Sequence, residues 1–98
     1  MSRINIIEVV LRSDGFLLVR PDLPEKSDYQ HIYRAANGIR WSPKDRALHP
    51  YELGSSSPTF WFARMIDAVK SEYGDELVLT SSTLWKDVPS DLQKEIQG

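Results

Sequence analysis

The chain has 98 residues, of which 41% are hydrophobic and 27% charged, and its formal net charge is −2. This composition is typical of one globular domain with a single core, and the small net charge disfavours indiscriminate binding to nucleic acids or acidic membranes. The absence of cysteine excludes disulfides, thiol catalysis and cysteine-based metal centres. No apolar run reaches the roughly 20 residues of a membrane-spanning helix, and the N-terminus lacks the pattern of a secretory signal, so we expect a cytoplasmic protein.

The first 20 residues predict a β-hairpin. The segment Arg3 to Arg12 contains INIIEVVL, which is rich in the β-branched residues that strands favour. Ser13-Asp14-Gly15 predicts the turn, because Asp-Gly supports the positive φ angles that tight hairpins need. Phe16 to Arg20 is the expected returning strand. The next segment, PDLPEKSD, combines two prolines with several charges and predicts an exposed loop.

A second hairpin is predicted around Asn37-Gly38. Gln30 to Ala36 and Ile39 to Ser42 flank this dipeptide as possible strands, and Asn-Gly between two such runs is a strong hairpin signal. A helix over Tyr29 to Ala36 is the alternative, because Asn-Gly can also end a helix. Residues 42–45 then predict a turn. Residues 46–51 predict a short extended piece that Pro50 confines to a sheet edge or a strand end.

The strongest helical pattern covers residues 57–73. Ser57 is suited to cap the N-terminus, Pro58 fits the first helical position, and Gly74 is suited to end the helix. At about 100° per residue, seven apolar side chains fall within an arc of roughly 160°. They are Trp61, Phe62, Met65, Ile66, Ala68, Val69 and Tyr73. We expect this stripe to pack on a sheet, with Arg64, Asp67, Lys70 and Ser71 on the opposite, solvated side.

The C-terminal part predicts one more strand and one more helix. Glu76 to Thr80 has the alternation of a strand, and residues 81–88 predict irregular structure or a single helical turn. Residues 89–97 predict a short helix that docks through Leu92 and Ile96, since it is too short to be stable alone. The whole pattern predicts one α+β domain over residues 1–98. We expect a mostly antiparallel sheet of four or five strands, with the long helix on one face and the short helix at the C-terminus.

No recognised catalytic or nucleotide-binding motif occurs in the sequence. His31 and His49, with Asp45 or Glu52 nearby in sequence, are the candidates for acid–base chemistry in a cleft. The competing interpretation is that each histidine packs, caps or faces solvent. Two histidines on separate strands are also too few ligands for a metal ion, and we predict neither a metal nor a cofactor.

The charges are divided along the chain, with a balance of +3 over residues 29–49 and −4 over residues 50–98. The basic part combines cations with aromatic rings, as protein-contact surfaces and single-stranded nucleic-acid surfaces do. Its candidate contact residues are Tyr29, Arg34, Arg40, Lys44 and Arg46. Strand alternation turns Tyr33 and Trp41 toward the core. Trp85 either packs in the core or stands exposed as an anchor for a partner.

Two segments carry a resemblance to known proteins. RAANGIRWSP, and SSTLWKDVP followed by a short helix, resemble small α+β proteins encoded on bacterial mobile gene cassettes, including integron cassettes and toxin-immunity loci. The resemblance covers about residues 31–98. It implies a protein without a cofactor that acts through protein contacts or as an oligomer. It assigns no catalytic residues.

These observations favour a small non-catalytic interaction or regulatory module that has a protein partner or self-associates and has no contact with a membrane. In a dimer, the basic segment Arg34 to Arg46 and a free sheet edge are the expected contacts. Two alternatives stay open. One is a single-stranded nucleic-acid binder that uses residues 29–46, and the other is a small enzyme or ligand-binding domain with His31 and His49 in a cleft.

Overall fold

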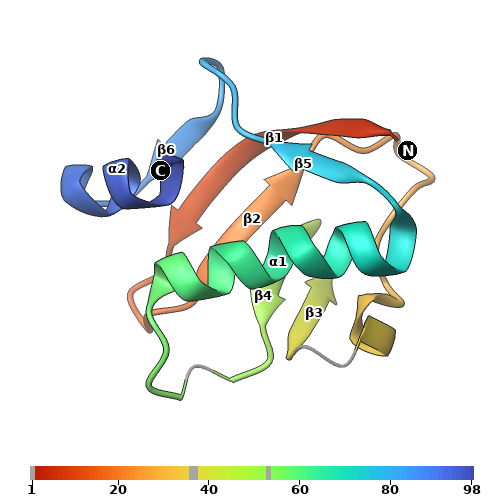
Figure 1. Cartoon of the computed structure of the whole chain (residues 1–98), viewed down its shortest axis with the longest axis horizontal. Coiled ribbons are helices and arrows are strands. Elements are labelled where there is room, and N and C mark those ends of the chain that lie inside the picture. Colours follow the sequence, from red (N-terminus) through yellow and green to blue (C-terminus); the bar gives the residue numbers. More distant parts are fainter. Residues whose placement is uncertain (1, 36–37, 53) are drawn as a thin grey trace.

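The computed structural model describes residues 2–35, 38–52 and 54–98 of the chain. In chain order its elements are β1 (Arg3–Leu11), β2 (Leu17–Pro21), the 3-10 helix η1 (Ile32–Ala35), β3 (Ile39–Ser42), β4 (Ala47–Pro50), α1 (Pro58–Tyr73), β5 (Glu76–Val78), β6 (Leu84–Lys86) and α2 (Ser90–Gln97). The strands form one sheet, and α1 runs across one of its faces (Figure 1). The predicted α+β class, with one long helix and a short C-terminal helix, is confirmed.

The N-terminal hairpin forms as predicted. β1 and β2 pair antiparallel, and the register shifts between Ile6 and Glu8, where a bulge bends β1. In the connecting turn, Asp14 Oδ1 accepts a hydrogen bond from the Phe16 backbone N–H at 3.1 Å. Gly15 has a φ of 92°, which explains why glycine follows Asp14 in the sequence.

The sheet is mixed, because two later strands both run parallel to β1. Its order is β3-β4-β2-β1-β5, and β6 also pairs with β1. β5 lies beside Arg3 to Asn5, whereas β6 lies beside Glu8 to Val10, so one edge of β1 is covered in two pieces. β6 corrects the prediction of irregular or helical structure over residues 81–88, and it brings the described strands to six. The pairing that creates it joins residues more than 70 positions apart, which a local pattern does not encode.

Thr83 fills the gap between β5 and β6. Its hydroxyl donates to the backbone carbonyl of Ile6 at 2.7 Å, at the bulge in β1, and accepts from the Thr80 N–H at 2.9 Å. Thr83 is only 6% exposed, and Ile6 only 1%. Between β5 and β6, the Thr83 side chain therefore supplies the hydrogen bond to Ile6 that the backbone of a continuous strand would have made.

The predicted second hairpin is only partly correct. β3 forms as predicted, with Ile39 and Trp41 facing the core. It pairs with β4 across the turn at residues 43–46, and not with a strand over residues 30–36. Asn37 lies outside the described residues, so the predicted Asn-Gly turn is not described. β3 is an edge strand, and β4 lies between β3 and β2 with Pro50 at its end, in agreement with one of the two places predicted for this proline.

The segment before β3 is a short helix because its side chains are anchored in three dimensions. The 3-10 helix η1 corrects the predicted strand over residues 30–36 and is closer to the helical alternative. Its Ile32 is fully buried, and the preceding Tyr29 is 1% exposed. The His31 N–H donates to the hydroxyl of Tyr73 on α1 at 3.0 Å. In a strand, residues three positions apart point to opposite faces, so the burial of both Tyr29 and Ile32 in one core does not fit a strand.

The long helix begins and ends where its sequence predicts. The Ser57 side chain accepts a hydrogen bond from the Phe60 N–H, Pro58 is the first helical residue, and Gly74 ends the helix in the left-handed conformation, with φ 72°. The buried residues of α1 are Phe62, Met65, Ala68 and Val69, and Trp61, Ile66 and Tyr73 are half-buried against them. The predicted apolar stripe therefore faces the sheet.

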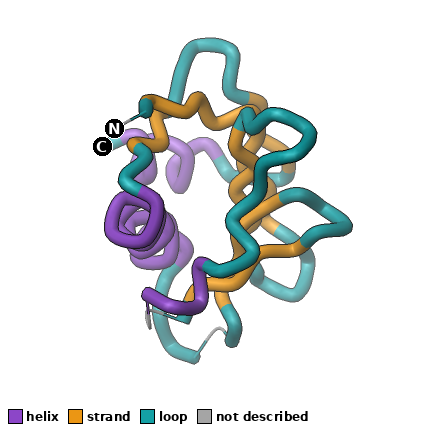
Figure 2. Tube along the Cα trace, turned by 90° about the vertical axis from the view of Figure 1, so that its right-hand side faces the viewer, coloured by secondary structure: helices purple, strands orange, loops and turns teal. Residues whose placement is uncertain are grey.

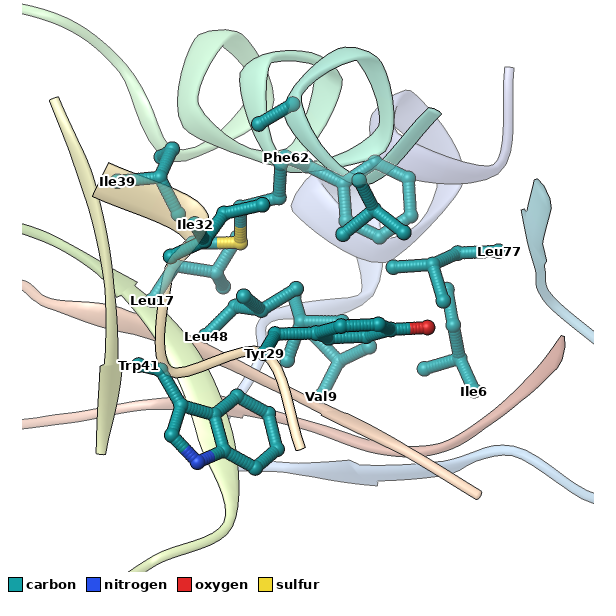
Figure 3. Packing of buried hydrophobic residues seen from close by; sticks show 14 of the residues in the cluster. Ile6, Val9, Leu17, Tyr29, Ile32, Ile39, Trp41, Leu48, Phe62 and Leu77 are labelled. Carbon is teal, nitrogen blue, oxygen red and sulfur yellow. The ribbon is translucent and has the colours of Figure 1, made fainter. Parts of the chain in front are cut away.

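One core lies between α1 and the sheet. Figure 3 shows Phe62 above the side chains of Leu48, Tyr29 and Val9, which come from different parts of the chain. Seen from the side in Figure 2, both α-helices lie on the same side of the strands. Ile96 of α2 belongs to this core, and Leu92 packs against it, so the short helix docks through the two predicted residues.

Candidate interaction surface

The two candidate acid–base residues make aromatic contacts and lie outside the pocket described below. His31 is exposed, and its ring centroid lies 6.1 Å from that of Tyr33. His49 is half-buried on β4, 6.4 Å from the ring of Phe16, and its Nδ1 donates to the Pro50 carbonyl oxygen at 2.8 Å. Within the described residues, no carboxylate is hydrogen-bonded to either imidazole. The structure therefore does not bring the histidines and an acid together as a catalytic group.

Tyr29 and Trp85, predicted as contact residues, lie at or in the core. Tyr29 is buried under α1, with its ring 5.7 Å from Trp41 and 4.7 Å from Tyr73, and its hydroxyl donates to Asp75 Oδ2 at 3.0 Å. Burial raises the pKa of Tyr29, and the nearby Asp75 carboxylate raises it further. Trp85 is half-buried on β6 and packs against the core cluster. Tyr29 therefore cannot contact a partner, and Trp85 mainly packs in the core.

The predicted basic segment is divided between different parts of the surface. Arg40 lies on β3, whereas Lys44 and Arg46 lie in the turn that leads to β4. Arg46 donates from its guanidinium to the backbone carbonyls of Pro24 and Ser27, at 3.2 and 2.7 Å, and thereby holds the loop after β2. Arg34 is exposed on η1. The structure therefore does not bring the four cations into one groove.

Arg40 lies between two exposed tyrosines. Its guanidinium carbon is 4.7 Å from the ring centroid of Tyr51 and 6.0 Å from that of Tyr33. Tyr51 is 61% exposed and Tyr33 47%, so the predicted orientation of Tyr33 toward the core is wrong. The Arg40 side chain donates to the carbonyl of its neighbour Ile39 at 3.0 Å. Cation–π attraction to the two rings holds the guanidinium of the half-buried Arg40 in place.

A second aromatic–arginine pair lies at the start of α1. Phe60 is 42% exposed, and the guanidinium of Arg64 lies 5.2 Å from its ring centroid. The ring of Trp61 contacts Phe60 edge-on at 5.3 Å. A Cβ atom placed on Gly38 would be 3.4 Å from the Trp61 ring, so the start of α1 packs against the backbone that leads into β3.

Gly38 contacts residues next to both pairs. Its carbonyl accepts a hydrogen bond from the Tyr51 N–H at 2.7 Å on one side, and its Cα faces Trp61 on the other. We call the two pairs together, Tyr33, Arg40, Tyr51, Phe60 and Arg64, the aromatic–arginine surface. Among the described residues, no carboxylate lies within 4 Å of the guanidinium of Arg40 or Arg64. The ion pairs between described residues involve other arginines and join Arg3 to Glu76, Arg12 to Asp14 and Arg20 to Glu8.

Sequence reasoning found Arg40 but missed Tyr51, Phe60 and Arg64. Phe60 carried a usable signal, because it lies near the centre of the polar side of the helix, where Arg64 and Asp67 also lie. A large aromatic residue on a solvated helix face is poorly explained by core packing. Tyr51 had no such signal, since the segment after Pro50 has no clear period.

The structure also contains a pocket of about 490 Å³ that opens to solvent between the loop after β2 and the C-terminal end of α1. Neither histidine lines it. Among the described residues, no three His, Asp or Glu side chains are placed to hold a metal ion. None of the helices formed by the described residues is long and apolar enough to cross a bilayer.

Comparison with known proteins gives one similar solved structure. The chain matches an integron cassette protein, Hfx_Cass5, from the mobile metagenome of the North West Arm sewage outfall, with 29% sequence identity and a TM-score of 0.48. The match covers 99% of this chain and 94% of the other. No protein-family model and no curated protein matches the chain. The resemblance to proteins of mobile gene cassettes, predicted from two short segments, is thereby confirmed as a similarity.

Proposed function

We propose that this chain is a protein-interaction module whose aromatic–arginine surface binds an acidic segment of a partner protein. One observation carries the proposal. Arg40 and Arg64 are each stacked on an exposed aromatic ring, and neither forms an ion pair with a described residue. Tyrosine, tryptophan and arginine are the residue types most enriched among those that dominate binding energy at protein interfaces.

The stacking also prepares the arginines for binding. A guanidinium that already lies over a ring loses less side-chain freedom when it pairs with a carboxylate, and its flat edge offers two parallel N–H donors. The exposed parts of Tyr33, Tyr51 and Phe60 offer apolar area beside these donors. An acidic segment with an aromatic or aliphatic side chain beside its carboxylates matches both features.

The nucleic-acid alternative has weaker support. Two of the rings that would have stacked on bases, Tyr29 and Trp41, are buried. Arg46 is occupied with the loop after β2, and Lys44 lies in the turn that follows β3, at the opposite end of this strand from Gly38. A single-stranded nucleic acid needs cations spaced along its backbone as well as rings. It remains an outcome of the test below.

The test is a selection from a displayed library of random peptides. We expect the wild-type chain to enrich peptides that combine Asp or Glu with a bulky apolar residue. We expect the double variant Arg40→Gln/Arg64→Gln to lose that enrichment. The matched control Lys70→Gln/Lys94→Gln removes the same charge from exposed positions on the two helices and should select like wild type. An enriched set without acidic residues, or one that the arginine variant retains, would contradict the proposal.

Two further measurements separate the alternatives. The first is fluorescence anisotropy of a labelled single-stranded RNA at low salt. Binding of the RNA to the wild-type chain, and not to the arginine variant, would favour the nucleic-acid alternative. Light scattering coupled to size exclusion tests self-association. Because residues 50–98 carry a net charge of −4, a dimer that the arginine variant dissociates would make a second copy the acidic partner. The cytoplasm stays our expected compartment, a prediction that cell fractionation would test.

A further inference from the structure

The pocket beside the end of α1 has the size and lining of a small-molecule site. Its volume of about 490 Å³ lies within the range usual for such sites. Two tyrosines, Tyr29 and Tyr73, and two acids, Asp28 and Asp75, form its polar wall, and Leu23 belongs to its apolar wall. The rim also carries one cation, Lys26, so the charged side chains of the lining sum to −1.

Both carboxylates have bonding capacity left. Asp75 accepts the Tyr29 hydroxyl through Oδ2, and Asp28 accepts the Gln30 N–H through Oδ1 at 3.2 Å. Among residues 2–35, 38–52 and 54–98, neither carboxylate forms an ion pair, and the second oxygen of each has no hydrogen-bond donor. Two negative charges beside one pocket, without a paired cation, attract a cationic ligand.

One aromatic ring defines what kind of cation fits. Tyr29 is only 1% exposed and packs against the ring of Tyr73 at 4.7 Å, so the half-buried Tyr73 is the ring available to a ligand in the pocket. Ring faces bind organic ammonium groups well, because methyl or methylene groups next to the nitrogen carry part of the charge and pack on the rings. A hydrated metal ion does not use such faces. Tyr73 accepts the His31 N–H, so its own proton is left to donate to an oxygen on the ligand.

We propose that this pocket binds a small organic ammonium compound, a primary or methylated amine that also carries a hydroxyl or similar oxygen. Asp28 and Asp75 balance the charge, the ring of Tyr73 contacts the carbon atoms next to the nitrogen, and the Tyr73 hydroxyl donates to the ligand oxygen. Leu23 contacts the remaining carbon chain. This site is separate from the aromatic–arginine surface and does not depend on the function proposed for that surface.

The test is a titration of the isotope-labelled protein by two-dimensional NMR with choline and with 3,3-dimethylbutan-1-ol, its neutral isostere. We expect saturable shifts at residues 28–31 and 73–75, with a dissociation constant for choline on the order of 1 mM, as expected for a ligand with few atoms. The neutral isostere should bind about tenfold more weakly, because it lacks only the charge. Equal binding of the two compounds would overturn the proposal, as would shifts that do not saturate.

Variants locate the charge recognition. Asp75→Asn keeps an acceptor for the Tyr29 hydroxyl and removes the charge. Asp28→Asn keeps an acceptor for the Gln30 N–H and likewise removes the charge. We expect each to weaken choline binding several-fold, whereas Asp91→Asn, an exposed residue on α2, should leave it unchanged. The spectra themselves show whether each variant is folded. Unchanged affinity in both pocket variants would overturn the proposal, and so would magnesium chloride that produces the same shifts as choline and competes with it.

Discussion

Replacement of Thr83 by valine tests whether this residue holds the two short parallel strands on β1. Valine keeps the shape of threonine and removes only the hydroxyl. Two hydrogen bonds are then lost, the one to the Ile6 carbonyl at 2.7 Å and the one from the Thr80 N–H at 2.9 Å. Each contributes about 1 kcal/mol net, and leaving the buried Ile6 carbonyl without a donor adds about 1 to 3 kcal/mol. We therefore expect Thr83→Val to lower the free energy of unfolding by about 3 to 5 kcal/mol.

This loss is large for a domain of this size. Small domains have net stabilities of about 5 to 15 kcal/mol, and 1 kcal/mol shifts the Tm of a domain of up to about 100 residues by about 4 to 8 °C. Urea unfolding followed by tryptophan fluorescence and by far-UV circular dichroism measures the change, provided that both probes give one transition with the same m-value.

Thr83→Ser is the matched control. It keeps the hydroxyl and removes one methyl group, so we expect a loss of about 1 kcal/mol. The reasoning is refuted if Thr83→Val unfolds within about 0.5 kcal/mol of wild type, the range of an ordinary surface change, or if serine is as harmful as valine. In the second case the methyl group, and not the hydrogen bonds, would be what the site needs.

Three further predictions concern the core and the turns. Met65→Asp places a charge at a fully buried position of α1 and should abolish the cooperative thermal transition in circular dichroism. Tyr29→Phe should cost about 1 kcal/mol at neutral pH, measured by urea unfolding. The pKa of Tyr29 is raised in the folded state, so the contribution of its hydroxyl to the free energy of unfolding is complete below the ordinary tyrosine pKa of about 10. This contribution is lost as the pH rises toward the pKa of the folded state. Above about pH 10, wild type should therefore lose stability more steeply than Tyr29→Phe. Gly38→Ala and Gly74→Ala should lower Tm by similar amounts, because both glycines have a positive φ and a Cβ atom at Gly38 would make only an ordinary contact with the Trp61 ring at 3.4 Å. A much larger loss of Tm for Gly38→Ala would contradict this.

The parts of the fold that the sequence predicts are those with local signals. α1 carries its own cap, first-turn proline, apolar stripe and terminal glycine, so its bounds follow from residues 57–74 alone. The β1–β2 hairpin likewise has its turn and both strands within 19 residues of chain. In these places, local preference and tertiary packing agree.

The errors arise where distant contacts decide the structure. β6 has three residues and exists because they pair with Glu8 to Val10, which lie far away in the sequence. The segment from Tyr29 to Ala35 alternates like a strand, yet the burial of Tyr29 and Ile32 against α1 and the core turns it into a 3-10 helix. No pattern within either segment contains that information.

The candidate surface was predictable only in part, for the same reason. Arg40 was found from its charge and its neighbours in sequence. Its contacts with Tyr51, and the approach of Phe60 through Gly38 and Trp61, depend on how β3, β4 and α1 are brought together. A surface assembled from three elements is not visible as a motif in any one of them.

The central position of β1 has a consequence for the order in which the molecule can form during synthesis. β1 leaves the ribosome before β5 and β6, which cover one of its edges and whose residues follow more than 70 positions later. Until then the nascent hairpin displays an unpaired, apolar strand edge, a feature that invites contact with other chains. The sheet is therefore completed only after β6 has been synthesised, and translation speed and chaperones can influence the yield of folded protein.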